Sequence, residues 1–552
     1  MTLDGKLTRK IPVSGSLSSL TLSQNGKFLI GGDYDGNLRV WTMDGKVRNV
    51  WKGHSDGVNS VDINPQGNLA VSGSSDGTVR VWNLTNGQSM ALLSSQNEWI
   101  SYSDDGIFDA SKEGGKLLGV TQGLVGYSVD QFAIRNNRPD ILLERMGLGA
   151  NSEIAHFRAQ YLKRLKRFGL QDEGSVNDYH IPRVEITQSE KQEKNIKISF
   201  HISDDKYRLK KYNVFVNGVP LYGSYGKDVD GSSADLTEIF ELSQGENRIE
   251  LSGINDKGVE SERPVLFARY SGEGRADLYF MGFGVSRYRN EQINLKYAHK
   301  DVNDLAQVFE KMEGSYKTIH KLTFTDDNVT VENIKKAKEF LKSSGVDDTF
   351  VLFIAGHGIH DVDKEETYYF LTHETDLNRL SSTAADFELI ENLLQGIPPR
   401  KKLFLMDTCE SGEVDDENRG TFLAMANSRG LQARAIRRGL KIETNQIRPY
   451  LYERDRFIYN DLLRRSGAVV FSSSLGGEFS YEEDKYRNGI FTKAIKDALS
   501  DPEADRDGSN TLSTQELRDY VSKEVQELTE GRQHPTIDRD NIYLPFGLPV
   551  IR

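Results

Sequence analysis

Two apolar runs in the second half of the chain each lead into a chemically reactive side chain, and this pattern restricts the fold more than any other feature. One run covers residues 349–355 and leads into His357, which has a glycine on either side. The other covers residues 403–406 and leads through Asp407 to Cys409. Short apolar runs bounded by polar residues are typical of buried parallel strands. The sequence therefore predicts an α/β sheet with both reactive residues at its carboxyl edge, where such sheets usually bind ligands.

Cys409 is the only cysteine among the 552 residues of the chain. A disulfide within the chain and a zinc site built from several cysteines are therefore both excluded. A lone cysteine is commonly a buried and inert thiol. A base such as His357 at the same sheet edge can instead convert the thiol to a nucleophilic thiolate. Taken alone, the residues leave both interpretations open.

The stretches around these two side chains resemble the signatures of caspase-like peptidases, and the metacaspase and orthocaspase branch of family C14, which is of bacterial type, is the most similar. They read Ala355-Gly356-His357-Gly358 and Asp407-Thr408-Cys409-Glu410-Ser411-Gly412. The resemblance covers residues 276–552. It implies a dyad in which His357 takes the thiol proton and Cys409 attacks the substrate carbonyl. It also implies an oxyanion hole formed by the backbone N–H groups of Gly358 and Cys409.

The same resemblance implies a specificity pocket. In metacaspases, acids at the positions of Asp301 and Asp407 line the pocket for the residue before the scissile bond. Two carboxylates there would attract a basic side chain, so we expect cleavage after Arg or Lys. The alternative for Asp301 is an acid that only complements the dipole of the helix that begins near it.

Residues 413–465 form a long insert with many basic side chains. Relatives often carry a processed linker at this place, and an enzyme that prefers basic residues would be able to cut its own insert. Arg434, Arg437 and Arg438 are the candidate self-cleavage positions. The alternative is a surface loop that is never cut.

The N-terminal region contains an internal repeat. Residues 35–41 return as residues 76–82, a shift of 41 residues, and each copy runs from Asp-Gly to Trp. A period near 40 with a Gly-His pair between the copies resembles WD40 propeller blades. We assign residues 1–97 to two blades, and residues 98–150 to a degenerate blade or connector. Two blades cannot close a ring, so we expect them to be part of a larger propeller that binds an unknown protein partner.

Two further segments precede the peptidase region. Residues 151–181 are predicted to be a basic helical linker whose cations Lys163, Arg164, Lys166 and Arg167 form a solvated face, with a docking surface as the alternative. Residues 182–271 alternate polar and apolar residues over short runs and contain the turn pair Asn217-Gly218. They favour an immunoglobulin-like β-sandwich.

No cofactor is required by this chemistry, and the histidines show no metal spacing. Residues 505–516 have acids at calcium-loop spacing, but Asn510 replaces the usual glycine. We favour a helix-capping box of Ser513 and Glu516. Calcium stays a candidate activator because it activates many metacaspases.

Charge and hydropathy limit the partners. The net charge of −12 argues against a general nucleic-acid binder. No apolar run is long enough to span a membrane. With the free thiol and no signal-peptide pattern at the N-terminus, these features favour the cytoplasm. The sequence predicts a multi-domain cysteine peptidase. Its resemblance to bacterial proteins that join WD40 repeats to a caspase-like domain implies a role in stress, cell-death or antiviral signalling. The competing prediction is an interaction scaffold whose caspase-like domain is silent.

Overall fold

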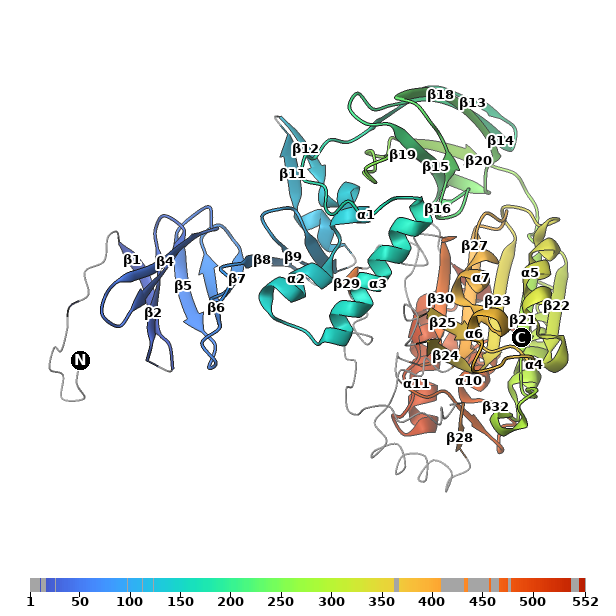
Figure 1. Cartoon of the computed structure of the whole chain (residues 1–552). Coiled ribbons are helices and arrows are strands. Elements are labelled where there is room, and N and C mark those ends of the chain that lie inside the picture. Colours follow the sequence, from blue (N-terminus) through green and yellow to red (C-terminus); the bar gives the residue numbers. More distant parts are fainter. Residues whose placement is uncertain are drawn as a thin grey trace. The chain divides into compact units, whose positions relative to one another are not determined.

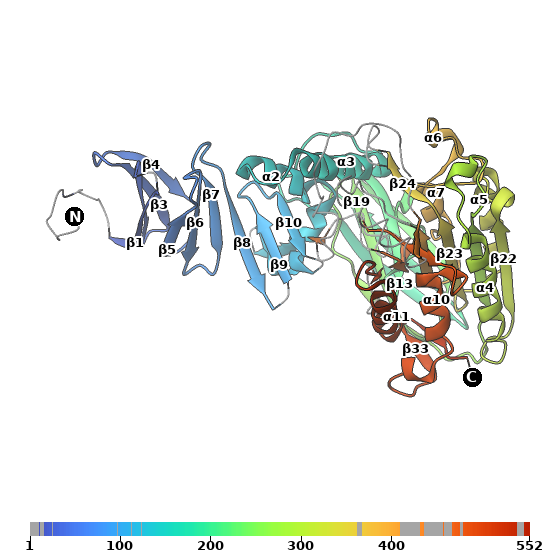
Figure 2. The ribbon, with the colours of Figure 1, turned by 90° about the horizontal axis from the view of Figure 1, so that it is seen from below.

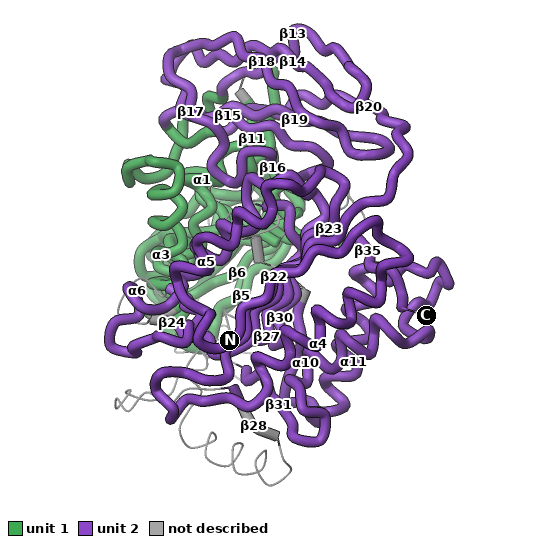
Figure 3. The backbone as a smooth tube through the Cα atoms, turned by 90° about the vertical axis from the view of Figure 1, so that its right-hand side faces the viewer, with its two compact units in different colours: residues 1–181, 257–259, 455–459 green, residues 182–256, 260–454, 460–552 purple. Residues whose placement is uncertain are grey.

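A computed structural model describes most of the chain (Figure 1). The described residues are 10, 16–24, 26–96, 98–111, 113–122, 124–361, 367–408, 431–434, 456–457, 466–474, 478–537 and 546–551. They form two compact units (Figure 3). Unit 1 comprises residues 1–181, 257–259 and 455–459, and unit 2 comprises the rest. None of the helices in the described ranges combines the length and the apolar character that crossing a membrane requires.

Unit 1 begins with antiparallel sheets that match the two predicted repeats. The first has the order β1-β2-β3-β4 and the second the order β29-β10-β9-β8-β7-β6-β5. The second sheet therefore extends into residues 98–111, because β8 pairs with β9. Gln96, between these two strands, has a φ of +55°. The strands are β1 Leu17–Leu22, β2 Phe28–Asp33, β3 Asn37–Thr42, β4 Val47–Lys52, β5 Val58–Ile63, β6 Leu69–Ser74, β7 Val79–Asn83, β8 Ser89–Ser95, β9 Glu98–Tyr102, β10 Phe108–Ser111 and β29 Arg456–Phe457.

A chain of hydrogen bonds links the Gly-His pair to the aspartate and the tryptophan of the second copy of the repeat. The indole of Trp82 donates to Ser72 Oγ at 2.8 Å, and His54 Nε2 lies 2.8 Å from the same oxygen. The other ring nitrogen of His54 is 3.0 Å from a carboxylate oxygen of Asp76. All four side chains are buried or nearly so. The network satisfies polar groups inside the second sheet. In the first copy Gly31 stands at the position of Ser72 and has no hydroxyl, so this network belongs to the second copy alone.

The rest of unit 1 is mostly helical, and one prediction for it was wrong. Helix α3 covers Asn151–Phe168, as the sequence predicted. However, Arg164 is only 2% exposed, because its guanidinium donates to the backbone oxygen of Asn137 at 2.7 Å. The cation cluster is therefore not a uniformly solvated face. The remaining elements are β11 Gly119–Gln122, β12 Val125–Ser128, α1 Ala133–Asn136 and α2 Pro139–Met146.

The first part of unit 2 consists of two antiparallel sheets around one apolar core. One has the order β13-β14-β18, and the other the order β16-β15-β19-β20 with β17 beside β15. Ile198 and Phe200 from the first sheet and Val214 and Leu251 from the second belong to the shared core. The predicted Asn217-Gly218 turn joins β15 and β16, with Asn217 at φ +53°. The strands are β13 Arg183–Gln192, β14 Asn195–Ser203, β15 Leu209–Val216, β16 Val219–Pro220, β17 Lys227–Asp228, β18 Ser233–Glu241, β19 Gly245–Asn255 and β20 Val265–Tyr270.

The second part of unit 2 is a mainly parallel sheet with the order β22-β21-β23-β27-β30-β34, in which only β34 is antiparallel. Residues of β21, β23 and β27 are almost all buried, which matches their continuous apolar runs. The strands are β21 Leu278–Gly284, β22 Ile319–Thr325, β23 Thr349–Gly356, β27 Lys401–Thr408, β30 Ala468–Ser472 and β34 Thr536–Ile537.

Helices cover both faces of this sheet. Figure 3 shows α5 on one side of the strands and α4, α10 and α11 on the other, and Figure 2 shows α10 beside α11. The helices are α4 Ala298–Glu310, α5 Val331–Ala337, α6 Leu380–Thr383, α7 Phe387–Asn392, α10 Ile490–Ala498 and α11 Thr514–Thr529. Short strands border the carboxyl edge, namely β24 Gly358–Asp361, β25 Thr367–Phe370, β26 Ala385–Asp386, β28 Leu431–Ala433, β31 Tyr481–Glu483 and β32 Asn488–Gly489; β33 Thr511–Ser513 and β35 Gly547–Pro549 pair with each other.

Candidate active site

The two predicted dyad positions follow neighbouring strands at the same sheet edge. Strands β23 and β27 are adjacent and parallel, and their register pairs Gly356 with Thr408. His357 and Cys409 are the residues that come next on each strand. Cys409 itself lies outside the described residues. The structure therefore fixes the strand that delivers the cysteine, and it describes the histidine in full.

The imidazole of His357 is held in one orientation. Its Nε2 lies 2.8 Å from the backbone oxygen of Ile293, and because a carbonyl only accepts, Nε2 carries the proton. The backbone N–H of His357 donates to the hydroxyl of Tyr288 at 2.9 Å. Nδ1 is buried and has no hydrogen-bond partner among the described residues. The neutral ring thus presents a free lone pair, as a base requires.

Burial lowers the pKa of His357 to about 4. The backbone groups of Ile293 and Arg434 act against this shift, and the positive charge of Arg434 adds to it. The side chain is 2% exposed, so the charged form loses most of its hydration. At neutral pH the imidazole is therefore uncharged and able to accept a proton.

Asp301 and Asp407 lie together, as the sequence predicted. Asp301, on the first turn of α4, accepts from Asn488 Nδ2 at 2.9 Å and from the backbone N–H of Gly489 at 3.0 Å. Asp407, near the end of β27, accepts from Ser480 Oγ at 2.6 Å and Thr492 Oγ1 at 2.7 Å. Both side chains are fully buried. The bonds of Asp301 reach other elements, so dipole complementation within α4 does not account for its position.

A third carboxylate completes the cluster, and the sequence analysis did not identify it. Glu482 on β31 is fully buried and accepts from the backbone N–H of Lys296 at 2.8 Å. Its Oε2 lies 3.6 Å from Nε of Arg434. In the sequence, Glu482 only lies within the range 276–552 that resembles caspase-like peptidases. That resemblance assigns no role to this individual residue.

Arg434 fills the space between the three carboxylates. Its Nη2 pairs with Asp301 Oδ2, and its Nη1 lies 3.0 Å from Asp407 Oδ2 and donates to the Asp407 backbone oxygen at 3.1 Å. The side chain is fully buried. Burial alone would lower the pKa of Arg434, but Asp407, Asp301 and Glu482 more than offset this and raise it. The three acids therefore form a pocket whose chemistry suits a guanidinium.

The segment before Arg434 lies along β31 as an added strand. Strands β28 and β31 are antiparallel, with Gln432 opposite Glu482 and Ala433 opposite Tyr481. The Arg434 N–H continues the pattern by donating to the Ser480 backbone oxygen at 2.8 Å. Extended peptides are commonly bound in this way, with main-chain bonds along an edge and one side chain in a pocket. Arg437 and Arg438 lie outside the described residues.

Gly358 begins strand β24, where it pairs with Phe370 of β25. It directly follows His357, so its backbone lies at the same sheet edge. Its assignment to an oxyanion hole, together with Cys409, stays a prediction.

Ser513 and Glu516 form the predicted capping box. The Ser513 hydroxyl accepts from the Glu516 N–H, and the Glu516 carboxylate accepts from the Ser513 N–H at 3.0 Å. Glu516 also accepts from the backbone of Arg506 and Asp507. Carboxylate oxygens of Asp505, Asp507 and Glu516 lie within 4.8 Å of one another. The hydrogen bonds account for Glu516 without an ion, and a calcium site here stays untested.

Comparisons with known proteins found two family models that match parts of this chain. Residues 282–546 match the family model of the caspase domain, and residues 5–42 and 45–83 match the WD domain with G-beta repeats. One similar solved structure is caspase-1 from Spodoptera frugiperda, with 14% identity and a TM-score of 0.29 over 48% of this chain and 88% of that one. A search of curated protein sequences found no significant match.

Proposed function

We propose that this chain, which contains WD40 repeats and a caspase-family peptidase domain, is a cysteine endopeptidase that cleaves peptide bonds after arginine or lysine. In this proposal the Cys409 thiol passes its proton to Nδ1 of His357 and attacks the scissile carbonyl. The imidazolium then protonates the leaving amine, and water hydrolyses the acyl-enzyme through the same base. The backbone N–H groups of Gly358 and Cys409 would hold the oxyanion.

The proposed preference for a basic residue before the scissile bond rests on one observation. The guanidinium of Arg434 is buried among Asp301, Asp407 and Glu482, and its backbone influences the pKa of His357. An arginine in the acidic pocket thus has its own peptide bond beside the candidate base. This arrangement supports Arg434, rather than Arg437 or Arg438, as the position of self-cleavage.

A lysine would also fit, but less well. Three carboxylates from three elements surround the planar guanidinium, and each of its two terminal nitrogens contacts a different acid. An ammonium group has one nitrogen and cannot contact the same acids from two sides. We therefore expect arginine to be preferred over lysine.

The remaining regions have proposed roles in recognition and regulation. The two antiparallel sheets of residues 182–271 fit an immunoglobulin-like sandwich, and the WD40 repeats suit binding of a protein partner that controls the peptidase. The metacaspase-type and bacterial assignments and a role in stress, cell-death or antiviral signalling rest on the sequence resemblance. The proposed cytoplasmic location rests on the free thiol and on the hydropathy of the chain. Calcium activation would be tested by assaying the enzyme with calcium and with a chelator.

A covalent probe tests the proposal directly. A peptidyl ketone electrophile with arginine next to the reactive carbon would be incubated with the full chain, and a matched probe would carry aspartate there. We expect the arginine probe to label Cys409, as located by mass spectrometry of the digested protein. Labelling should be lost in Cys409→Ala and strongly slowed in His357→Ala. Equal labelling by both probes, or labelling that does not depend on His357, would contradict the proposal.

A further inference from the structure

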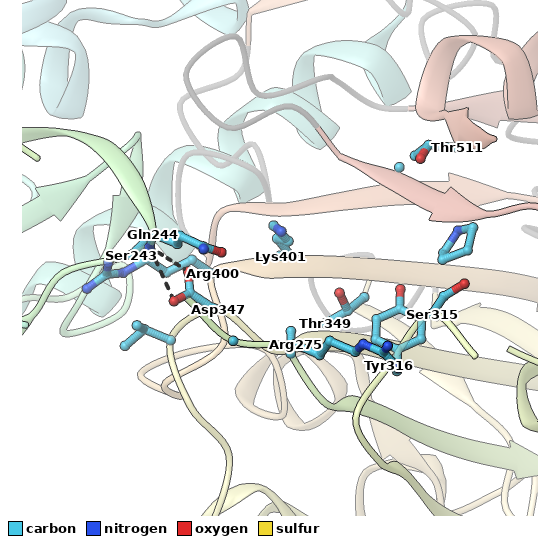
Figure 4. A pocket seen from close by; sticks show the side chains of 15 residues that line it. Ser243, Gln244, Arg275, Ser315, Tyr316, Asp347, Thr349, Arg400, Lys401 and Thr511 are labelled. Atoms are coloured by element: carbon cyan, nitrogen blue, oxygen red, sulfur yellow. Dashed lines mark hydrogen bonds between the residues drawn. The ribbon is translucent and has the colours of Figure 1, made fainter. Parts of the chain in front are cut away.

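A cavity in unit 2, whose lining side chains Figure 4 shows, lies at the sheet edge opposite the one that carries His357. Thr349 and Lys401, the first residues of β23 and β27, are part of its wall. His357 follows the far end of β23, so roughly 25 Å of extended strand separates the two sites. The cavity measures about 430 Å³, which is in the range of small-molecule sites. It is thus distinct from the acidic pocket.

Positively charged side chains outnumber negative ones in this cavity. Arg275, Arg400 and Lys401 line it, against the single acid Asp347. The Asp347 carboxylate accepts from the backbone N–H of Gln244 at 2.9 Å and interacts electrostatically with Arg400. The local excess of positive charge contrasts with a chain whose net charge is −12, and it favours an anionic ligand.

The three cations differ in how many hydrogen bonds they already form within the protein. Arg400 is 2% exposed and donates to Ser243 Oγ at 2.6 Å, so it holds the turn that closes one side of the cavity. Arg275 is exposed and donates to one backbone oxygen, that of Gly314, at 3.3 Å. Neither Arg275 nor Lys401 forms an ion pair within the described part of the chain. Both have donors left for a ligand.

We propose that this cavity binds a small phosphate-bearing molecule through Arg275 and Lys401. A phosphate offers several acceptor oxygens to a guanidinium and an ammonium at once. The hydroxyls of Ser315 and Thr511, which also line the cavity, supply neutral donors of the kind that often complete such sites. The site is independent of the peptidase chemistry, and its occupant is either inorganic phosphate or pyrophosphate, or a nucleotide.

Binding to the full chain tests this proposal. Calorimetric titration with phosphate, pyrophosphate and ATP, with adenosine and chloride as controls, would be run on the chain and on Lys401→Glu. Lys523→Glu is the matched control, since Lys523 is an exposed residue of α11 outside the cavity. We expect at least one phosphate compound to bind, and Lys401→Glu to weaken it by about tenfold or more, because a charge-assisted bond becomes a repulsion. Lys523→Glu should bind like the unaltered chain.

The milder variant Lys401→Gln guards against misfolding, and it should give an intermediate loss with an unchanged circular dichroism spectrum. Tighter binding of ATP than of pyrophosphate would identify a nucleotide site. Tighter binding of pyrophosphate would identify a site for free phosphates. The proposal is overturned if none of the three compounds binds at concentrations up to about 10 mM, or if both glutamate variants bind equally well. Neither result depends on peptidase activity.

Discussion

At the scale of single residues, the most informative group is the buried guanidinium of Arg434. Taking a charge out of water costs several kcal/mol and is repaid only by close partners with good geometry. Three buried carboxylates supply those partners here. Without the arginine, the same carboxylates would lie close together with no positively charged partner. The three carboxylates therefore stabilise the buried cation of Arg434.

Asp407→Asn tests the charge of the pocket. The amide keeps the shape of the side chain but removes its charge, so we expect kcat/KM for an arginyl peptide to fall roughly 30- to 1000-fold, the equivalent of about 2–4 kcal/mol. Asp327→Asn removes an exposed acid outside the pocket and serves as the control. Equal activity of the two variants would show that Asp407 does not bind the arginine.

Gly489→Ala tests the space around the guanidinium. A Cβ at this position would lie 2.4 Å from Asp407 Oδ2 and 2.7 Å from Arg434 Nη2. We expect KM for an arginyl peptide to rise about tenfold or more, because the methyl group occupies part of the pocket. The control is Gly314→Ala, where a Cβ meets nothing within 4 Å. An unchanged KM in Gly489→Ala would place the arginine elsewhere.

Activity should also depend on the protonation of Asp301. Burial raises the pKa of Asp301 to about 6; Asp407 adds to the shift, and Arg434 opposes it. As pH falls through this value the pocket loses a negative charge, so KM for an arginyl peptide should rise below about pH 6. A carboxyl group whose pKa is raised in the folded state stabilises the fold at low pH, and this stabilisation disappears as pH rises. Unfolding linked to Asp301 therefore does not explain a rise in KM at low pH. An Asp301→Asn variant that kept the same inflection in KM would contradict this assignment.

At the scale of elements, the sequence predicted the parts that depend on local pattern. The apolar runs of β23 and β27 predicted His357 and Cys409 at one sheet edge, and the structure pairs Gly356 with Thr408, the residues directly before them, on adjacent parallel strands. Glu482 was missed because its place in the pocket follows from the pairing of β31 with β28 and from the path of the chain around it, which no periodicity encodes. Likewise, Arg164 was misjudged because its partner, Asn137, is distant in sequence.

The pairing of β28 with β31 also bears on the proposed self-cleavage. Arg434 continues the ladder and reaches the acids, whereas Arg437 and Arg438 lie outside the described residues. Arg434→Ala should therefore abolish cleavage after position 434 while activity on added arginyl peptides is retained. Fragment masses of this variant, compared with those of Arg437→Ala and Arg438→Ala, check the assignment. If cleavage persists in Arg434→Ala and stops in Arg437→Ala or Arg438→Ala, the self-cleavage site is not Arg434.

At the scale of the whole molecule, the chain contains several separate apolar cores. The largest belongs to the peptidase sheet, another to the two antiparallel sheets of residues 183–270, and smaller ones to unit 1. We expect scanning calorimetry to show more than one unfolding transition, with a calorimetric enthalpy larger than the van't Hoff enthalpy. A single two-state transition would show that the cores unfold as one.

We propose that the acidic pocket and the dyad act together on arginyl peptides. The most direct test is the hydrolysis of two fluorogenic peptides that differ only in arginine or aspartate before the reporter, with the unaltered chain and Cys409→Ala. We expect hydrolysis of the arginine peptide alone, and its loss in Cys409→Ala. Hydrolysis of the aspartate peptide would contradict the pocket, and hydrolysis by Cys409→Ala would contradict the nucleophile.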